Sequence, residues 1–302
     1  MARASKRPVA VTSSLLRRWP LPQPGEQADK QDRGVAMVIG GAAEVPGALA
    51  LAGVAALRAG AGKLKIAGPR SAMSGLGVAI PEARVIGLPE TGDGFLDRRS
   101  ASRAADVATA EAILIGPGML NEEAIRGFMD EIIRRVADRI LVIDALALCA
   151  LRGGRYRFSE DTSVVLTPNV GEMAKITGDT PETIERDPQG VALRVSEDLN
   201  VVVALKGPET IIASPYGEIF RYADGDVGLA TSGSGDVLAG ALVGILARGA
   251  TLDQATVWAV YLHGEAGNRL ARRIGPIGFL ARELCDELAP VMNGLSKKRT
   301  TK

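Results

Sequence analysis

Histidine and cysteine are scarce in this chain, and their scarcity excludes several kinds of site. The 302 residues include one histidine, His263, and two cysteines, Cys149 and Cys285. One imidazole cannot supply a multi-histidine metal cluster or an HExxH site, and it argues against a histidine-based catalytic triad. Two cysteines cannot build a disulfide framework or a cysteine-rich metal site. Any chemistry must therefore use carboxylates, lysine, hydroxyl groups or backbone amides.

These three scarce residues have a simpler interpretation in the fold. We expect His263 to be a core histidine with a satisfied hydrogen bond rather than a catalytic base. The two cysteines are expected to be small buried side chains, and their low number favours a reducing, cytoplasmic setting.

Charge of one sign, aromatic side chains and long apolar runs are also lacking. Lys and Arg number 36 against 35 Asp and Glu, which gives a net charge of +1, and aromatic residues make up 4% of the chain. Balanced charge argues against electrostatic binding to nucleic acid or to a membrane, and few aromatics argue against a base-stacking platform. Glycine, proline or charge interrupts every apolar run before about 18 residues, and no apolar signal segment follows the basic N-terminus. The sequence therefore predicts a cytoplasmic protein with no nucleic-acid or membrane partner.

Glycine is abundant, with 36 copies, and many of them end short apolar runs. Runs typical of buried strands occur at 35–39, 64–67, 112–115, 140–143, 164–167 and 201–205. Residues 210–213 and 218–222 flank a turn and predict a hairpin. Helical patterns run from Pro46 to about Gly60, from about Asp236 to Arg248 and from about Asp253 to Arg272. The alternation predicts an α/β fold with a mostly parallel sheet flanked by helices on both faces.

The chain shows no internal repeat, low-complexity linker or change of composition. We therefore expect residues 1–29 to be an N-terminal extension, residues 30–294 a single catalytic domain, and residues 295–302 a polar C-terminal tail. The tail, which ends in SKKRTTK, is expected to be solvated rather than to contact nucleic acid.

The sharpest local motif is TSGSGD at residues 231–236, followed at once by the apolar run VLAGALVGILARG. Small residues leave backbone N–H groups accessible where a helix begins, and the helix dipole adds partial positive charge, so this loop suits a phosphate or a developing oxyanion. Asp236 would lie at the same helix start. Two interpretations of Asp236 stay open at this point: a functional carboxylate or a helix cap.

Two further strand ends carry polar residues. Lys206 and Gly207 follow the apolar run at 201–205, where ligands gather in open α/β sheets, so a cation and accessible backbone could lie beside a nucleotide. The alternative is an exposed turn lysine. Asn169 and Glu172 follow the run at 164–167, where Glu172 could hold Mg²⁺ through water. The alternative there is a capping box between these two side chains.

Taken in order along the chain, these motifs resemble those of the bacterial ADP-dependent NAD(P)H-hydrate dehydratases, a branch of the ribokinase-like superfamily. The resemblance covers about residues 30–291 and rests on these segments: KQDRGVAMVIGG, VPGALALAGVAALRAGAGKL, ILIGPGM, VIDALAL, LTPNVGEMAKITG, VVVALKGPETIIASPYG, GLATSGSGDVLAGALVGILARG, AVYLHGEAG and IGFLARELCDEL. It implies a ribokinase-like fold. Because the epimerase domain of fused relatives has no room in this chain, it also implies the stand-alone dehydratase form.

The resemblance further implies a reaction and a set of site residues. Such enzymes repair hydrated NADH or NADPH: ADP, or alternatively ATP, phosphorylates the hydrate's hydroxyl with Mg²⁺ present, and phosphate then leaves. Asp236 resembles the catalytic base and also a substrate contact. The residues that resemble substrate contacts are Ala48, Gly118 and Asn169, and Glu172 resembles a residue that holds Mg²⁺ through water. The residues that resemble the nucleotide and phosphoryl site are Lys206, Gly207, Pro208, Glu209, Thr210, Gly233 and Gly235.

Two departures from the family pattern bear on this interpretation. SGSGD stands where the family usually has GGTGD, which keeps the loop small. Asn169 stands where the family usually has histidine, and TPNxxE resembles vitamin and sugar kinases of the same superfamily. A small-molecule kinase therefore stays the alternative, and a nucleotide-binding regulator without turnover is a third, although such a binder would not need Asp236. ADP against ATP and NADH hydrate against NADPH hydrate stay open, and self-association into a homo-oligomer is a further expectation.

Overall fold

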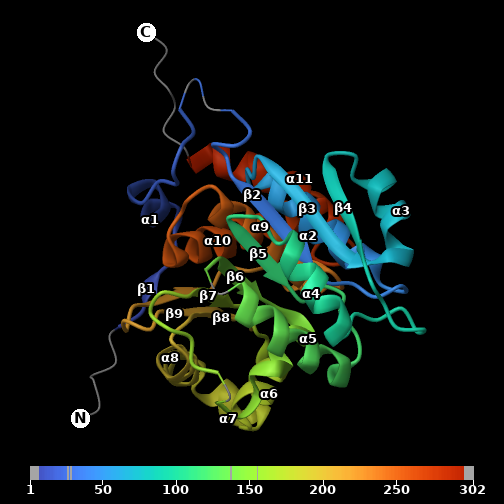
Figure 1. Ribbon diagram of the computed structural model, residues 1–302. Coiled ribbons are helices and arrows are strands. Elements are labelled where there is room, and N and C mark those ends of the chain that lie inside the picture. The colour runs from blue at the N-terminus through green and yellow to red at the C-terminus, as the bar shows by residue number, and fades with distance from the viewer. Residues whose placement is uncertain (1–6, 26, 28, 137, 155, 296–302) are drawn as a thin grey trace.

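Ten strands form one sheet in the computed structural model, within residues 7–25, 27, 29–136, 138–154 and 156–295, which are the residues it describes (Figure 1). The strands are β1 (Val9–Ala10), β2 (Val35–Ile39), β3 (Lys63–Pro69), β4 (Ala83–Leu88), β5 (Ala112–Ile115), β6 (Ile140–Ile143), β7 (Ser163–Leu166), β8 (Val202–Leu205), β9 (Thr210–Ala213) and β10 (Ile219–Tyr222). The helices are α1 (Ser13–Arg18), α2 (Pro46–Arg58), α3 (Arg70–Ala79), α4 (Arg98–Val107), α5 (Glu122–Arg135), α6 (Val170–Thr177), α7 (Pro181–Arg186), α8 (Pro188–Leu199), α9 (Ser234–Ala247), α10 (Leu252–Arg273) and α11 (Ala281–Leu295). Two 3₁₀ segments are η1 (Ala145–Gly154), whose backbone is non-helical at Arg152 and Gly153, and the short η2 (Val227–Leu229).

The strand order is β1-β10-β9-β8-β7-β6-β5-β2-β3-β4. Neighbours from β8 to β4 are parallel, whereas β9 is antiparallel to both β8 and β10. Chain order reverses between β2 and β5, so this pair is the topological switch point, beside which ligands bind in open α/β sheets. The sheet brings the carboxyl ends of β2, β5, β6, β7 and β8 to one edge.

The predicted α/β architecture is confirmed, and each strand expected from an apolar run is present within two residues of its expected ends. The sequence patterns missed β1 and β4. Both lie at edges of the sheet, where β1 has two exposed residues and β4 is only partly buried. Edge strands need no continuous apolar run, so the pattern that revealed the inner strands was absent from them.

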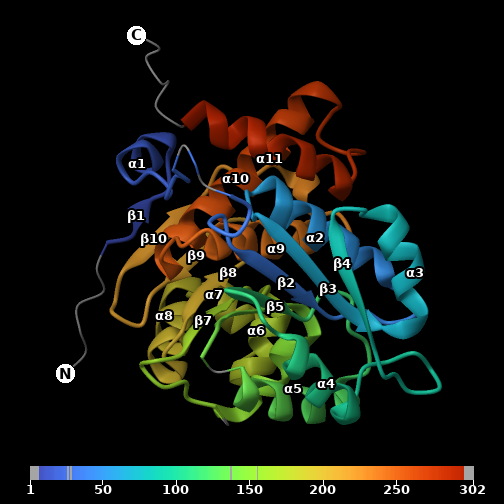
Figure 2. The ribbon, with the colours of Figure 1, turned by 45° about the horizontal axis from the view of Figure 1, so that its top comes forward.

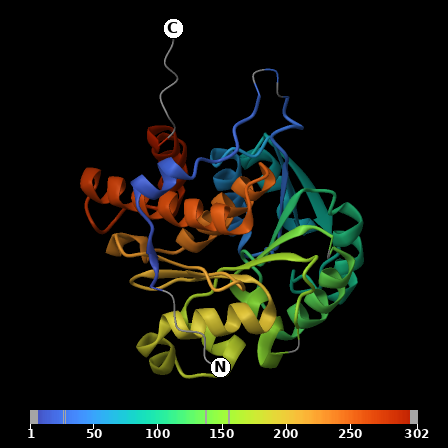
Figure 3. The same cartoon turned by 90° about the vertical axis from the view of Figure 1, so that its left-hand side faces the viewer.

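Helices cover both faces of the sheet (Figures 2 and 3). Side chains alternate along the inner strands: Ala36 and Val38 of β2 join the core under α2, α9, α10 and α11, whereas Met37 and Ile39 join the core under α4 to α8. Because successive strand residues point to opposite faces, a strand buried on both sides must be apolar throughout. This is why β2 is a continuous apolar run with every residue buried.

Helices α2 and α9 approach each other so closely that backbone meets backbone. A Cβ added to Gly240 would lie 2.2 Å from the Ala52 carbonyl oxygen, and one added to Gly244 would lie 2.3 Å from the Ala56 carbonyl oxygen. Glycines four residues apart lie on one face of a helix and meet alanines with the same spacing. The small residues of both helices are therefore required for this close packing, which fixes the position of α9 against α2.

The segment before residue 30 packs on the rest of the chain. Strand β1 pairs in parallel with β10, and the ring of Trp19 stacks on Phe220 with centroids 5.9 Å apart. The side chains of Arg248 and Trp258 donate hydrogen bonds to the carbonyls of Pro22 and Trp19, at 2.8 Å each. The expected boundary at residue 30 stays a prediction, and most of the expected polar tail, residues 296–302, lies outside the described residues.

Cys149 and Cys285 are buried and unpaired with each other, as expected for small core side chains. Among the described residues, none of the helices combines the length and apolar character needed to cross a membrane.

Substituting Gly244 by alanine should destabilise the protein. Inside a helix, alanine is normally more stabilising than glycine by about 1 kcal/mol. Here its methyl group would overlap the Ala56 carbonyl, and overpacking of this kind lowers the stability of the folded protein by about 1–3 kcal/mol. The matched control is Gly75→Ala in α3, where the added Cβ has no neighbour within 4 Å and stability should rise slightly. Urea unfolding measures both changes. A Gly244→Ala protein as stable as the control would contradict the close contact of α2 and α9.

Candidate functional site

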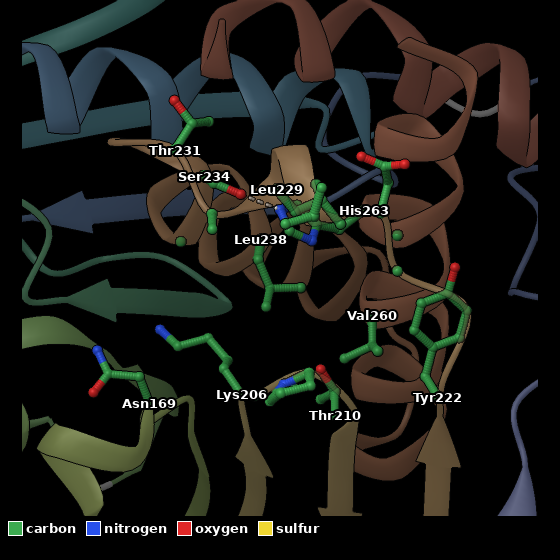
Figure 4. Close-up of a pocket in the computed structure, with 18 residues that line it drawn as sticks. Asn169, Lys206, Thr210, Tyr222, Leu229, Thr231, Ser234, Leu238, Val260 and His263 are labelled. Carbon is green, nitrogen blue, oxygen red and sulfur yellow. Dashed lines mark hydrogen bonds between the residues drawn. The ribbon is translucent and has the colours of Figure 1, made fainter. Parts of the chain in front are cut away.

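A cavity of about 770 Å³ lies between the carboxyl end of β8, the β9–β10 hairpin and helices α9 and α10 (Figure 4). Asn169 and Lys206 are at one end of it, and Tyr222 is at the other. Apolar side chains, including those of Leu238 and Val260, line the space between them. Its volume is within the range of about 300–1,000 Å³ that is usual for small-molecule sites, and a few polar groups converge on mostly apolar walls.

Helix α9 begins at this cavity without a side-chain cap. Gly233 occupies the N-cap position with φ 87°, a left-handed conformation, and a Cβ there would lie 2.4 Å from Leu51 Cδ1 of α2. Within the described chain, no side chain accepts a hydrogen bond from the first amides of α9. Ser234 and Gly235, the first two helical residues, line the cavity. The uncapped amides and the helix dipole therefore favour an anion at this end of the cavity.

Asp236 is the third residue of α9, and the capping interpretation of this residue is wrong. The N-cap is Gly233, and the Asp236 carboxylate forms no capping hydrogen bond. Burial is the main cause that raises the pKa of Asp236 to about 7. The negative charges of Asp144 and Glu172 contribute to this rise, and the positive charge of Lys206 opposes it. A carboxylate with a pKa near 7 is well matched to accept a proton at neutral pH.

Lys206 is the cation at the centre of this group of carboxylates. Its Nζ lies 3.0 Å from Asp144 Oδ1 and 3.9 Å from Glu172 Oε2. Asp144 is 2% exposed, and its Oδ1 also accepts a hydrogen bond of 2.6 Å from Thr167 Oγ1. Burial lowers the pKa of Lys206, but the nearby carboxylates outweigh it and raise that pKa above its ordinary value. Lys206 therefore stays charged at the cavity, where it also interacts electrostatically with Asp236.

Asn169 and Glu172 form the capping box that was the alternative interpretation of their motif. Asn169 Oδ1 accepts a hydrogen bond of 2.9 Å from the Glu172 amide, and Glu172 Oε2 accepts one of 2.8 Å from the Asn169 amide. Asn169 nevertheless also lines the cavity. The pKa of Glu172 is raised above its ordinary value, mainly by burial, and the positive charge of Lys206 opposes this rise.

The carboxylates fit a magnesium ion only in part. Oxygen donors of Asp and Glu are the ligands that Mg²⁺ prefers, and Asp144 and Glu172 each have a carboxylate oxygen within 3.9 Å of Lys206 Nζ. In the described part of the chain, however, no group of three or more acidic, histidine or cysteine side chains is arranged to hold a metal ion. The donor set therefore fits an ion that keeps most of its water and shares ligands with bound phosphates, as Mg²⁺ commonly does.

Comparisons with known proteins identify the family to which this site belongs. The profile described as NAD(P)H-hydrate dehydratase matches residues 36–290. The chain is 41% identical over 290 residues to the ADP-dependent (S)-NAD(P)H-hydrate dehydratase of Xanthomonas campestris pv. campestris, covering 95% of this chain and 97% of that protein. The chain belongs to the NAD(P)H-hydrate dehydratase family.

Solved structures agree with this assignment to the dehydratase family. The ADP/ATP-dependent NAD(P)H-hydrate dehydratase of Bacillus subtilis, co-crystallised with ATP and Mg²⁺, matches with a TM-score of 0.84 at 30% identity, covering 97% of this chain and all of that one. A ribokinase-like superfamily protein of Enterococcus faecalis matches with a TM-score of 0.83 at 24% identity, covering 98% and 99%, and shows the shared fold alone. The resemblance inferred from the motifs and the predicted ribokinase-like fold are both confirmed.

The structure brings together most, but not all, of the predicted site residues. Gly207, Pro208 and Thr210 line the cavity beside Lys206. Glu209 does not: it is exposed and forms an ion pair with Arg221. The roles assigned to these residues in a dehydratase stay predictions.

Ala48 and Gly118, the predicted substrate contacts, meet each other outside the cavity. Gly118 has φ 67°, and a Cβ added to it would lie 2.9 Å from the Ala48 Cβ. This contact lies at the switch point, where the Gly41 amide after β2 donates a hydrogen bond of 2.7 Å to the Pro117 carbonyl after β5. Leu51, one turn after Ala48 in α2, packs on Gly233, so α2 connects this contact to the start of α9.

Two polar residues of the site were assigned no functional role from the sequence. Asp144 follows β6 and belongs to the segment VIDALAL, in which no residue was given a role. His263 was expected in the core; it has a hydrogen-bond partner, as expected, but it lines the cavity. The sequence offered no clear signal for this placement. Only the structure shows that the next residue of α10, Gly264, must be small, because a Cβ there would lie 2.2 Å from Tyr222 Cε1.

Asp236→Asn should stabilise the folded protein at neutral and alkaline pH. The folded pKa of about 7 lies above the ordinary value of 3.8, so protonation favours the folded state, and its stabilising effect is lost as the pH rises from about 4 to about 7. Asparagine removes this penalty, which we put at about 1–3 kcal/mol after allowing for partial exposure. Urea unfolding at pH 8 should show the gain, and it should shrink toward pH 4. The exposed Asp93→Asn is the control; equal effects of the two variants at pH 8 would contradict the raised pKa.

Lys206→Ala should weaken binding of ADP, because the variant lacks the ammonium group beside the start of α9. A hydrogen bond to a charged group contributes about 1.5–3 kcal/mol, so the dissociation constant should rise about tenfold to more than a hundredfold. Calorimetry measures the change. Lys175→Ala is the control, since Lys175 is also paired with a carboxylate, that of Glu122, but does not line the cavity. A folded Lys206→Ala protein with unchanged ADP affinity would reject this placement of the nucleotide.

Proposed function

We propose that this chain catalyses the ADP-dependent dehydration of hydrated NADH or NADPH through a phosphorylated intermediate. Its membership of the dehydratase family supports this function over nearly the whole length of the chain. The single structural observation that carries the proposal is the position of Asp236, whose carboxylate has a raised pKa at the uncapped start of α9 and is electrostatically coupled to Lys206. A base, a site for an anion and a cation are the elements that phosphoryl transfer to a hydroxyl requires.

The first step is phosphorylation of the hydroxyl group that the hydrate carries on its nicotinamide ring. The Asp236 carboxylate accepts the hydroxyl proton as the oxygen attacks the terminal phosphorus of the nucleotide, and the bond from that phosphorus to the bridging oxygen breaks. The amides that begin α9 bind the transferred group, and Gly233 and Gly235 keep side chains out of its way. Lys206 supplies positive charge to the phosphates.

The second step is elimination. The carbon–oxygen bond breaks and phosphate leaves, while a proton leaves the neighbouring ring carbon, which restores the reduced nicotinamide. Phosphate is a far better leaving group than hydroxide, so the phosphorylation makes the dehydration feasible. In this arrangement Lys206, Gly207, Pro208 and Thr210 hold the nucleotide, as the cavity lining supports. We assign hydrate contacts to Ala48, Gly118 and Asn169.

Mg²⁺ is proposed as the accompanying ion, with Glu172 as a residue that would hold it through water. When bound, the ion would neutralise charge on the nucleotide phosphates. The solved Bacillus subtilis relative was crystallised with ATP and Mg²⁺, which makes both nucleotides reasonable donors to test here. A cytoplasmic location and self-association remain predictions.

The proposed function is tested by following product formation from NADPH hydrate. With ADP or ATP and Mg²⁺, the wild-type chain should restore the absorbance of reduced nicotinamide and release one free phosphate per turnover. Asp236→Asn is nearly isosteric but lacks the base, so turnover should fall at least about a hundredfold, since a general base typically contributes about 10²–10⁴. A stable phosphate ester in place of free phosphate would instead indicate a small-molecule kinase. Binding of both ligands without turnover would indicate a regulator.

A further inference from the structure

His263 is the only histidine of the chain, and its imidazole faces the nucleotide cavity. It projects from the middle of α10, and its Nε2 lies 2.8 Å from Ser234 Oγ, across the interface between α10 and α9 (Figure 4). Neither residue was given a role above. Their contact places a ring nitrogen next to Ser234, which is the first helical residue of α9 at the proposed anion site.

Ser234 is buried and hydrogen-bonded at that position. It is 5% exposed, its amide donates a hydrogen bond of 3.2 Å to the Thr231 carbonyl, and it lines the cavity next to Gly235. Among the hydrogen bonds of the described residues, His263 is the partner of the Ser234 hydroxyl. The direction of this hydrogen bond therefore decides where the hydroxyl hydrogen points.

A neutral imidazole has one N–H donor and one nitrogen acceptor, and a serine hydroxyl has one hydrogen. If Nε2 accepts, the serine hydrogen is used within the protein, and a lone pair faces the incoming phosphate. If Nε2 carries the hydrogen and donates it to Oγ, the serine hydrogen is free to point into the cavity. Only the second arrangement makes the hydroxyl a donor to an anion.

The surroundings of the ring favour a neutral donor. Burial, together with the positive charge of Lys206, lowers the pKa of His263 to about 4, so the ring is neutral and carries a single N–H at neutral pH. The uncapped amides of α9 next to the hydroxyl already favour an anion, and a lone pair aimed at that anion would be repelled.

We propose that His263 is a positioning residue that donates its Nε2 hydrogen to Ser234 Oγ and thereby directs the serine hydroxyl toward a phosphate oxygen of the bound nucleotide. The hydroxyl then joins the amides of Gly235 and Asp236 as a donor at the start of α9. This inference rests on the proposed function only in taking a nucleotide phosphate as the occupant of the site. His263 itself touches neither the phosphorus nor the attacking oxygen.

The tautomer of His263 can be measured directly, because a chain with one histidine gives one set of imidazole signals. Nitrogen-15 NMR of the wild-type protein, labelled in the histidine ring and saturated with ADP at pH 7.5, should show a protonated Nε2 and an unprotonated Nδ1. A hydrogen on Nδ1 in the ADP complex would overturn the proposal, because Nε2 would then accept from the serine.

Substitutions test the consequence for binding. The amide nitrogen of glutamine can reach the position of Nε2, whereas that of asparagine reaches only the position of Nδ1. We expect His263→Asn and Ser234→Ala each to raise the dissociation constant of ADP about tenfold, His263→Gln to retain most of the affinity, and the double variant His263→Asn/Ser234→Ala to bind no more weakly than either single variant. Additive losses, or a folded glutamine variant as weak as the asparagine variant, would contradict the proposal.

Adenosine provides the matched ligand control, since it lacks the phosphates. Its affinity, measured by calorimetry on the same variants together with their melting curves, should change less than twofold. An equal loss of adenosine and ADP binding would show that His263 acts on the base or the ribose and would reject the assignment. None of these measurements uses the hydrate. Failure of the wild-type chain to restore NADPH would therefore reject the proposed function, whereas the role of His263 is decided by the NMR and nucleotide-binding data alone.

Discussion

The contact between the backbones of α2 and α9 is the constraint on which the site depends. Because Gly240 and Gly244 have no side chain, α9 settles directly against α2, and its first turn is fixed in position relative to the carboxyl edge of the sheet. Gly233 completes the arrangement by turning the chain between Leu51 of α2 and Ala281 of α11. Rigid, uncapped amides can bind an anion without rearranging, which is the condition for electrostatic stabilisation of a transferred phosphoryl group.

Charge is distributed at this edge so that function and stability oppose each other. The carboxylates of Asp144, Glu172 and Asp236 all interact electrostatically with Lys206, so they share its single positive charge. Asp144 makes the closest contact, at 3.0 Å, and so orients the ammonium group. Burial, together with the negative charges of Asp144 and Glu172, raises the pKa of Asp236 to about 7 against the opposing charge of Lys206, which makes it a stronger base than an ordinary aspartate. Burying the Asp236 carboxylate lowers the stability of the folded protein, and the same burial makes the carboxylate basic enough to accept a proton.

The sequence predicted the elements of the fold well where apolar runs were continuous. The inner strands, the hairpin and the helices around α9 followed from such runs, whereas β1 and β4 did not, because an edge strand is buried on one side at most. At the site, strand ends and the small-residue loop pointed to Lys206 and to the start of α9. Local patterns could not show that Asp236 fails to cap its helix, because that depends on the conformation of Gly233.

Long-range contacts account for what the sequence did not reveal at the site. His263 meets Ser234 across 29 positions, and Lys206 meets Asp144 across 62, so neither pairing produces a periodic signal. The same limit applies to Glu209, which the motif placed beside the nucleotide. Its ion pair with Arg221 on the neighbouring strand β10 turns it away from the cavity. Motif position alone does not determine side-chain direction.

The N-terminal segment also protects the sheet from unwanted association. Strand β10 would be the outermost strand if β1 were absent, and an exposed strand edge offers unpaired N–H and C=O groups to other chains. The two residues of β1 occupy part of that edge, and the carbonyls of residues 19–22 hold the segment in place through Arg248, Gln254 and Trp258. A version of the protein trimmed to begin at residue 30 would expose both the ring of Phe220 and this edge. It would therefore be more prone to aggregate, even though every residue of the cavity is retained.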